Sequence, residues 1–166
     1  IIPEKFRLKL AAQFNENVKK HGCRMVTGFI GTPYLLFVLA DNGYWDTARH
    51  VLLNNGFPGW LYEVDMGATT VWERWDGIRP DGTLNPDNMC SYNHYAYGSV
   101  MEFVYRRIAG IETKEAGFAK ICVAPHPVKG LSKFHAEYKS VRGKIISEYR
   151  QKDGKITYVT EIPEGT

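Results

Sequence analysis

Apolar and polar positions follow a helical period over the N-terminal third of the chain. A stripe with four-residue spacing predicts a helix over 3–21, with Pro3 in its first turn and Gly22 after its end. The stripe consists of Phe6, Leu10, Phe14 and Val18. Two shorter helices are predicted at about 33–41 and 44–54, each followed by a glycine. Short antiparallel helices joined by tight glycine turns are typical of an array of helical hairpins.

The helical period is lost between residues 56 and 93, where glycine and proline are frequent and most of the tryptophans lie. Long irregular insertions between helices are uncommon and are usually functional. The helical pattern returns at HYAYGSVMEFVYRRIAGI, where a second stripe ends before Gly110. This stripe consists of Tyr97, Val100, Val104 and Ile108.

Beyond about Gly117 the period changes to two, which predicts β-strands. Two such stretches are FAKICVAP and FHAEYKSV, and two more, GKIISEYRQ and KITYVTEIP, flank Asp153-Gly154, a strong hairpin signal. The predicted fold class is α+β, with antiparallel α-hairpins over 1–114 and antiparallel strands over 115–166. Three or four strands are too few for a closed sandwich, so the second domain is expected to be cut short.

Composition and charge exclude several classes of protein. The chain is 44% hydrophobic and 23% charged, as in globular domains, and its net charge is +3. A small basic cluster ends the first predicted helix, but no basic stripe with base-stacking spacing follows, so no nucleic-acid partner is expected. The longest apolar run, YLLFVLA, is far shorter than a membrane span, so no membrane partner is expected either.

The three cysteines, Cys23, Cys90 and Cys122, are an odd number at wide, unrelated spacings. This argues against a disulfide framework and against a zinc site, and predicts free thiols. One disulfide with one spare cysteine is the alternative, so the compartment stays open. The chain begins at Ile1 with no initiating Met and no signal peptide. It is therefore expected to be an excised fragment, and missing targeting signals say nothing about its parent.

The stretch GATTVWERWDG places Glu73 between Trp72 and Trp75. Glycoside hydrolysis usually needs two carboxyl groups on opposite sides of the scissile bond. In an inverting enzyme, one protonates the leaving oxygen and the other takes a proton from the attacking water. Glu73 suits the second role. The alternative is that Glu73 pairs with Arg74 or another arginine and only holds the loop.

Other polar residues of the irregular segment are weaker candidates. His94 follows at the start of the next predicted helix and is either structural or a donor to sugar hydroxyls. Glu63 and Asp65 lie close to the aromatic cluster. The remaining acids, Asp76, Asp81 and Asp87, are expected to form turns.

Three segments, in order, resemble the bacterial α-L-rhamnosidase family: TGFIGTPYLLFVLADNGYWDTA, FPGWLYEVDMGATTVWERWDG and SYNHYAYGSVMEFVYRRIAGI. The resemblance runs over roughly Ile2 to Pro127 and thins through the strands to Pro163. It implies an (α/α)6 barrel followed by a C-terminal β-sandwich. This chain would hold the last helices of the barrel and the opening strands of the sandwich.

The resemblance also implies a function. It implies inverting hydrolysis of terminal α-L-rhamnosyl residues from rhamnose-containing oligosaccharides or glycosides, with no cofactor and no metal in the chemistry. Glu73 resembles the family's general base and His94 a direct rhamnose contact. The cleft-lining aromatics would be Trp60, Trp72 and Trp75. The family's general acid lies upstream, so the chain alone is expected to be inactive. Exposed barrel faces are expected to make it self-associate.

Three other functions remain open. The chain could belong to another glycosidase built on helical hairpins, such as a glucosidase or a fucosidase. It could be a non-catalytic carbohydrate-binding or interaction module, in which Glu73 would be locked in a salt bridge. It could also be an inactive paralogue that kept the fold.

Overall fold

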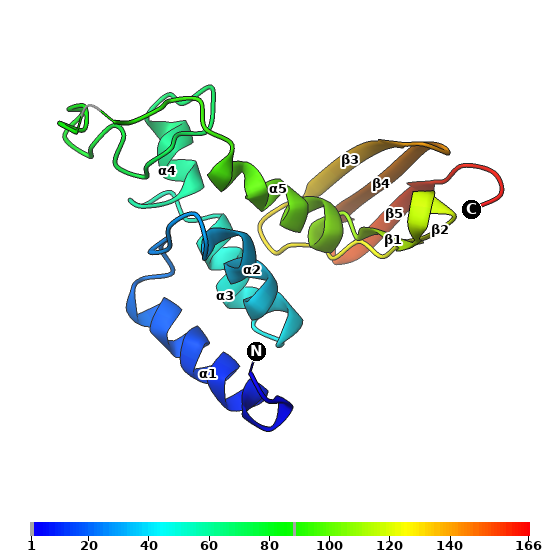
Figure 1. The fold of residues 1–166 in the computed structure, drawn as a ribbon. Helices are drawn as coiled ribbons and strands as arrows, with labels where there is room; N and C mark the ends of the chain where they lie inside the picture. Colours follow the sequence, from blue (N-terminus) through cyan, green and yellow to red (C-terminus); the bar gives the residue numbers. More distant parts are fainter. Residues whose placement is uncertain (1, 88) are drawn as a thin grey trace. The chain divides into compact units, whose positions relative to one another are not determined.

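The computed structural model describes residues 2–87 and 89–166, which fall into two compact units. The first unit, Ile1–Val100, is helical with a long irregular segment. The second unit, Met101–Thr166, is mostly antiparallel sheet (Figure 1). The chain therefore changes from helices to strands in the order that its periodicity predicts.

The three predicted N-terminal helices are confirmed as α1 (Glu4–Lys20), α2 (Thr32–Asp41) and α3 (Trp45–Leu52). α2 and α3 pack side by side (Figure 1). Their buried side chains include Leu35, Leu36, Leu39, Ala48 and Val51. α1 joins them through a buried hydrogen bond of 2.6 Å from the hydroxyl of Thr47 to Oδ1 of Asn15.

The apolar stripe of α1 is only half covered. Ala11 and Val18 are buried, whereas Phe6 and Leu10 keep 46% and 39% of their surface exposed. The C-terminal half of the helix therefore packs into the first unit, and its N-terminal half presents apolar surface to solvent.

The irregular segment includes a short helix that the pattern did not predict, α4 (Trp60–Asp65). The predicted helix after it is confirmed as three successive turns of different pitch. These are η1 (Ala96–Ser99, 3-10), α5 (Val100–Phe103) and η2 (Val104–Ile108, π).

In the second unit, β1 (Ile111–Glu115) and β2 (Lys120–Val123) form an antiparallel pair. The strands β3 (Lys133–Ser140), β4 (Gly143–Lys152) and β5 (Lys155–Glu161) form a three-stranded antiparallel sheet (Figure 1). The pattern did not predict β1, because only Ile111 of its five residues is buried and no alternation is visible.

The predicted Asp153-Gly154 hairpin is confirmed between β4 and β5. Both residues have positive φ, 51° and 73°, as a tight two-residue turn requires. The core of this unit lies between the sheet and the strand pair and includes Ala109, Ile111, Ala136 and Ile145.

Candidate functional site

Two segments that flank the irregular loop lie side by side. The N–H of Glu73 donates to the carbonyl of Ser91 at 2.8 Å, and the N–H of His94 donates to the carbonyl of Val71 at 2.8 Å. The hydroxyl of Thr70 donates to the carbonyl of Tyr92. The loop between them therefore folds back, and the segments carrying Glu73 and His94 meet although they are distant in sequence.

The carboxylate of Glu73 is half-buried and is held by the backbone. Its Oε2 accepts the N–H of Ser91 at 2.7 Å, so Ser91 binds both the main chain and the side chain of Glu73. These two hydrogen bonds with Ser91 orient the Glu73 carboxylate, and no ion pair is needed to hold it.

Arg74 does not neutralise Glu73. Its guanidinium forms ion pairs with Asp76 at 3.1 Å and Asp87 at 2.7 Å. Within residues 2–87 and 89–166, Glu73 takes part in no ion pair. The alternative in which Glu73 is tied to Arg74 therefore does not describe this structure.

The ring of His94 stacks against two other aromatic rings. It stacks on Phe29, with ring centroids 4.8 Å apart, and on Tyr95, with centroids 5.3 Å apart. The N–H of Ala96 donates to Nδ1 at 3.3 Å, so Nδ1 is an acceptor and the neutral ring carries its proton on Nε2. His94 therefore presents Nε2–H as its donor.

The predicted cleft tryptophans form an aromatic cluster in the fold. Trp75 is 9% exposed, stacks on Tyr97 at 3.9 Å and donates its Nε1–H to the carbonyl of Thr27 at 3.0 Å. Trp60 meets Trp75 edge-on at 5.5 Å and donates to the carbonyl of Tyr97 at 2.9 Å.

Trp72 is buried and meets Tyr92 edge-on at 5.6 Å. The three indoles therefore support the segment that carries Glu73. Their contact with a sugar stays a prediction.

Glu63 lies in α4 and is 4% exposed. Its Oε2 accepts the N–H of Trp72 at 3.5 Å, while Oε1 is buried with no hydrogen-bond partner in the part of the chain that the structure describes. Burial raises the pKa of Glu63 to about 7, against the opposing effect of the Trp72 hydrogen bond. Sequence reasoning ranked this residue low, because only the packing of α4 reveals its burial.

The other acids have local partners. Asp81 accepts the N–H and the hydroxyl of Thr83 at 2.9 and 2.7 Å, which confirms its turn and lowers its pKa. Asp76 and Asp87 are held by Arg74, and Asp65 is exposed on α4.

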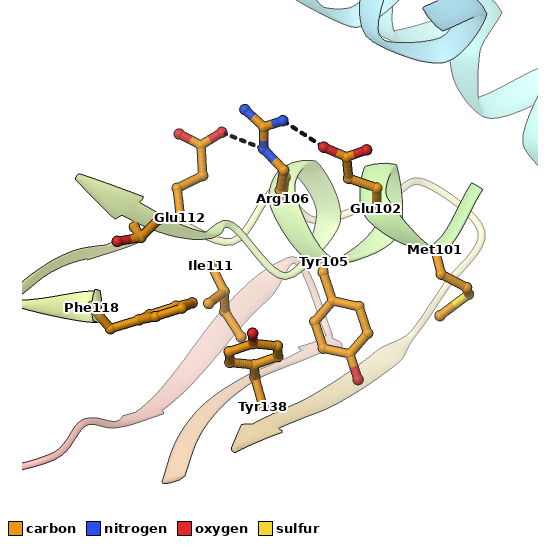
Figure 2. A pocket seen from close by; sticks show the side chains of 9 residues that line it. Met101, Glu102, Tyr105, Arg106, Ile111, Glu112, Phe118 and Tyr138 are labelled. Carbon is orange, nitrogen blue, oxygen red and sulfur yellow. Dashed lines mark hydrogen bonds and ion pairs between the residues drawn. The ribbon is translucent and has the colours of Figure 1, made fainter. Parts of the chain in front are cut away.

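Hollows occur in both units. One of about 270 Å³ in the first unit is lined by Phe57, Pro58, Arg74, Trp75, Asp76 and Tyr97. Another of about 630 Å³ lies in the second unit, with Tyr105, Ile111, Phe118 and Tyr138 gathered beneath a charged rim (Figure 2). Arg106 pairs with Glu102 and Glu112 across that rim, which contains none of the predicted site residues.

Residues 1–108 match the family described as the bacterial alpha-L-rhamnosidase 6 hairpin glycosidase domain. Residues 110–166 match the bacterial alpha-L-rhamnosidase C-terminal domain. The chain belongs to the bacterial α-L-rhamnosidase family. The resemblance drawn from the three sequence segments is thereby confirmed, and so is the predicted fold class of barrel hairpins followed by antiparallel strands.

Solved structures of the family match nearly the whole chain. A crystal structure of the Streptomyces avermitilis α-L-rhamnosidase complexed with L-rhamnose matches with a TM-score of 0.95 and 38% identity, covering 99% of this chain and 16% of that one. The native Aspergillus terreus α-L-rhamnosidase matches with a TM-score of 0.94 and 31% identity, covering 99% of this chain and 19% of that one.

Curated relatives belong to the same family. An α-L-rhamnosidase of Streptomyces avermitilis is 37% identical over all 166 residues, which cover 16% of its length, and one of Formosa agariphila is 34% identical, with 18% of its length covered. The chain thus spans less than a fifth of the relatives it matches. Among the described residues, no helix combines the length and apolarity needed to cross a membrane.

Proposed function

We propose that this chain is the part of an α-L-rhamnosidase that carries the general base of the reaction. The reaction would be inverting hydrolysis of terminal α-L-rhamnosyl residues, on rhamnose-containing oligosaccharides or glycosides. Membership of the family supports the proposal, as does the match to a relative whose crystal structure contains L-rhamnose. The observation that carries it is the Glu73 carboxylate, held by Ser91 and unpaired with any cation of the described residues.

The geometry of Glu73 suits the activation of water. A general base must keep one oxygen available to the attacking water while its orientation stays fixed. The Ser91 N–H occupies Oε2, so Oε1 is the oxygen assigned to the water.

His94 and the indoles would bind the sugar. The stacked ring of His94 presents Nε2–H in a fixed direction, which suits donation to a rhamnose hydroxyl. Trp60, Trp72 and Trp75 would shape the pocket by supporting its wall from behind.

The 166-residue chain assayed alone is expected to be inactive. Inversion needs a second carboxyl group that protonates the leaving oxygen. Among the nearby acids, Arg74 holds Asp76 and Asp87, and Thr83 holds Asp81. Glu63 is buried behind the segment that carries Glu73, and Asp65 points to solvent on α4. We propose that the general acid lies in another part of a longer protein. Turnover of a rhamnoside by the purified chain, at the rate of a complete rhamnosidase, would contradict this.

The test is Glu73→Gln in the complete protein, assayed on p-nitrophenyl α-L-rhamnoside. Loss of a general base is expected to lower kcat by about 10²- to 10⁴-fold, with partial rescue by azide. Asp65→Asn, which removes an exposed carboxylate nearby, is the control and should leave kcat unchanged.

Each alternative has its own outcome in this assay. Full activity of Glu73→Gln would show that another residue is the general base, and would favour a structural role for the segment that carries Glu73. A complete protein that is inactive on the rhamnoside but hydrolyses a glucoside or fucoside would point to a different glycosidase. Inactivity on every glycoside would favour a binding module or an inactive paralogue.

A further inference from the structure

Glu63 is a buried carboxyl group that the proposed reaction does not use. It is 4% exposed, and its Oε1 has no hydrogen-bond partner among residues 2–87 and 89–166. Residues of this chain alone produce that burial, so any further polypeptide can only add to it. An unpartnered buried carboxyl oxygen destabilises the fold, which makes a structural role alone a poor account of Glu63.

One hydrogen bond links Glu63 to the residue before Glu73. Oε2 of Glu63 accepts the N–H of Trp72, the residue directly before Glu73. On the other side, Ser91 exchanges two hydrogen bonds with Glu73, one to its main chain and one to its carboxylate. The Trp72–Glu73 segment is therefore held between α4 and Ser91.

We propose that Glu63 is a positioning residue for Glu73: the buried carboxyl group of Glu63 accepts the Trp72 N–H and so aligns the Glu73 carboxylate for catalysis. This inference rests on the proposed function. Glu63 itself touches neither water nor sugar in this scheme, since it is buried behind the segment that carries the base.

The surroundings of Glu63 favour its neutral form. Burial raises its pKa to about 7. The titratable groups that face it are the phenols of Tyr62 and Tyr97, which offer no positive charge. The nearest guanidinium along the segment, Arg74, is committed to Asp76 and to a second aspartate.

The alignment of Glu73 is expected to worsen as the pH rises. As the pH rises through about 7, Glu63 loses its proton and places an uncompensated negative charge behind Trp72. Water must then reach the Glu63 carboxylate, or α4 must shift. Either change disturbs the hydrogen bond from the Trp72 N–H to Glu63. Alignment of Glu73 is therefore complete below this pH and declines above it.

Activity of the complete protein on p-nitrophenyl α-L-rhamnoside gives the first test. Glu63→Gln keeps an acceptor and removes the ionisation, so the alkaline limb of its kcat profile should move to higher pH. Glu63→Ala removes the acceptor, so kcat should fall about 10- to 100-fold with little change in KM. Asp65→Asn, an exposed carboxylate on the same helix, should match the wild type. Identical pH profiles for wild type and Glu63→Gln would overturn the proposal.

A second measurement does not depend on activity. In the ¹⁵N-labelled 166-residue chain, the amide of Ser91 reports on Glu73 because it donates to that carboxylate. Its resonance should shift with a midpoint near pH 7 in the wild type and lose that transition in Glu63→Gln. A transition that persists in Glu63→Gln would overturn the positioning role even if the enzyme is a rhamnosidase. Inactivity on rhamnoside with the transition present would instead overturn the proposed function alone.

Discussion

At the scale of single residues, Glu63 and Glu73 occupy opposite environments within one loop region. Glu73 is half-buried and accepts a short bond from Ser91, whereas Glu63 is buried with one long bond from Trp72. Water can reach the first carboxyl group but is excluded from the second. Environments that differ in this way assign different roles to chemically identical side chains.

The raised pKa of Glu63 makes stability fall as pH rises. The folded state holds the proton up to about pH 7 and the unfolded state only up to about 4.5, so unfolding is favoured progressively between these values. We expect Glu63→Gln to gain stability relative to the wild type between pH 5 and pH 7, by at most about 1.4 kcal/mol per pH unit. Urea unfolding of both chains at pH 5 and pH 8 checks this. An equal difference at the two pH values would contradict it.

At the scale of elements, the connection from η2 to β1 decides how the chain passes from helix to strand inside the second unit. Gly110 has φ of +68°, and a Cβ there would lie 2.0 Å from the carbonyl oxygen of Ala124. Two residues later, the hydrogen bond from Lys114 and the ion pair with Arg107 lower the pKa of Glu112 to about 2, against the opposing effect of burial.

Gly110→Ala should destabilise the second unit severely, by more than about 4 kcal/mol, since backbone strain and a main-chain clash act together. Gly117→Ala is the matched control, because Gly117 has φ of +66° with open space around it. Gly117→Ala should lose only the stability that backbone strain costs, about 1–2 kcal/mol. Thermal unfolding of both variants measures the difference. If the two variants were destabilised equally, the close contact between position 110 and the Ala124 carbonyl would not matter for stability.

Glu112→Gln tests the ion-pair cluster on β1. Its depressed pKa means that its contribution is present above about pH 4.5 and is lost as the pH falls toward about 2. We expect the variant to be destabilised by roughly 1–3 kcal/mol at pH 7 and by almost nothing near pH 2. Urea unfolding at the two pH values decides.

At the scale of the whole molecule, the first unit exposes several large apolar side chains. Leu8, Ile30 and Tyr34 keep 76%, 89% and 66% of their surface exposed, and a hollow of about 920 Å³ lies between α1 and α2. Large exposed apolar patches mark interaction surfaces.

The 166-residue chain is therefore expected to self-associate. Sedimentation at micromolar concentration should give a mass above the 18.9 kDa of the monomer. The double variant Leu8→Glu, Ile30→Glu should shift the population toward monomer, whereas Lys129→Glu in the second unit should not. A wild type that stays monomeric across the concentration range would show that these faces do not associate on their own.

Local spacing in the sequence determined much of this protein. Apolar period predicts α1, α2, α3 and the helix that ends before Gly110, and Asp153-Gly154 predicts its hairpin, because these depend on neighbours a few residues away. The sequence also singles out Glu73 and His94, through ordered segments that match a family, and their roles at the site stay predictions.

Only the tertiary structure determined which residues of the loop region bind one another. The ion pair of Arg74 with Asp87, the hold of Ser91 on Glu73 and the burial of Glu63 all depend on how the loop closes. The partners in these contacts are separated by many residues, and no local period encodes the closure of a loop. The same holds for β1, whose polar residues form a strand only because β2 supplies its hydrogen bonds.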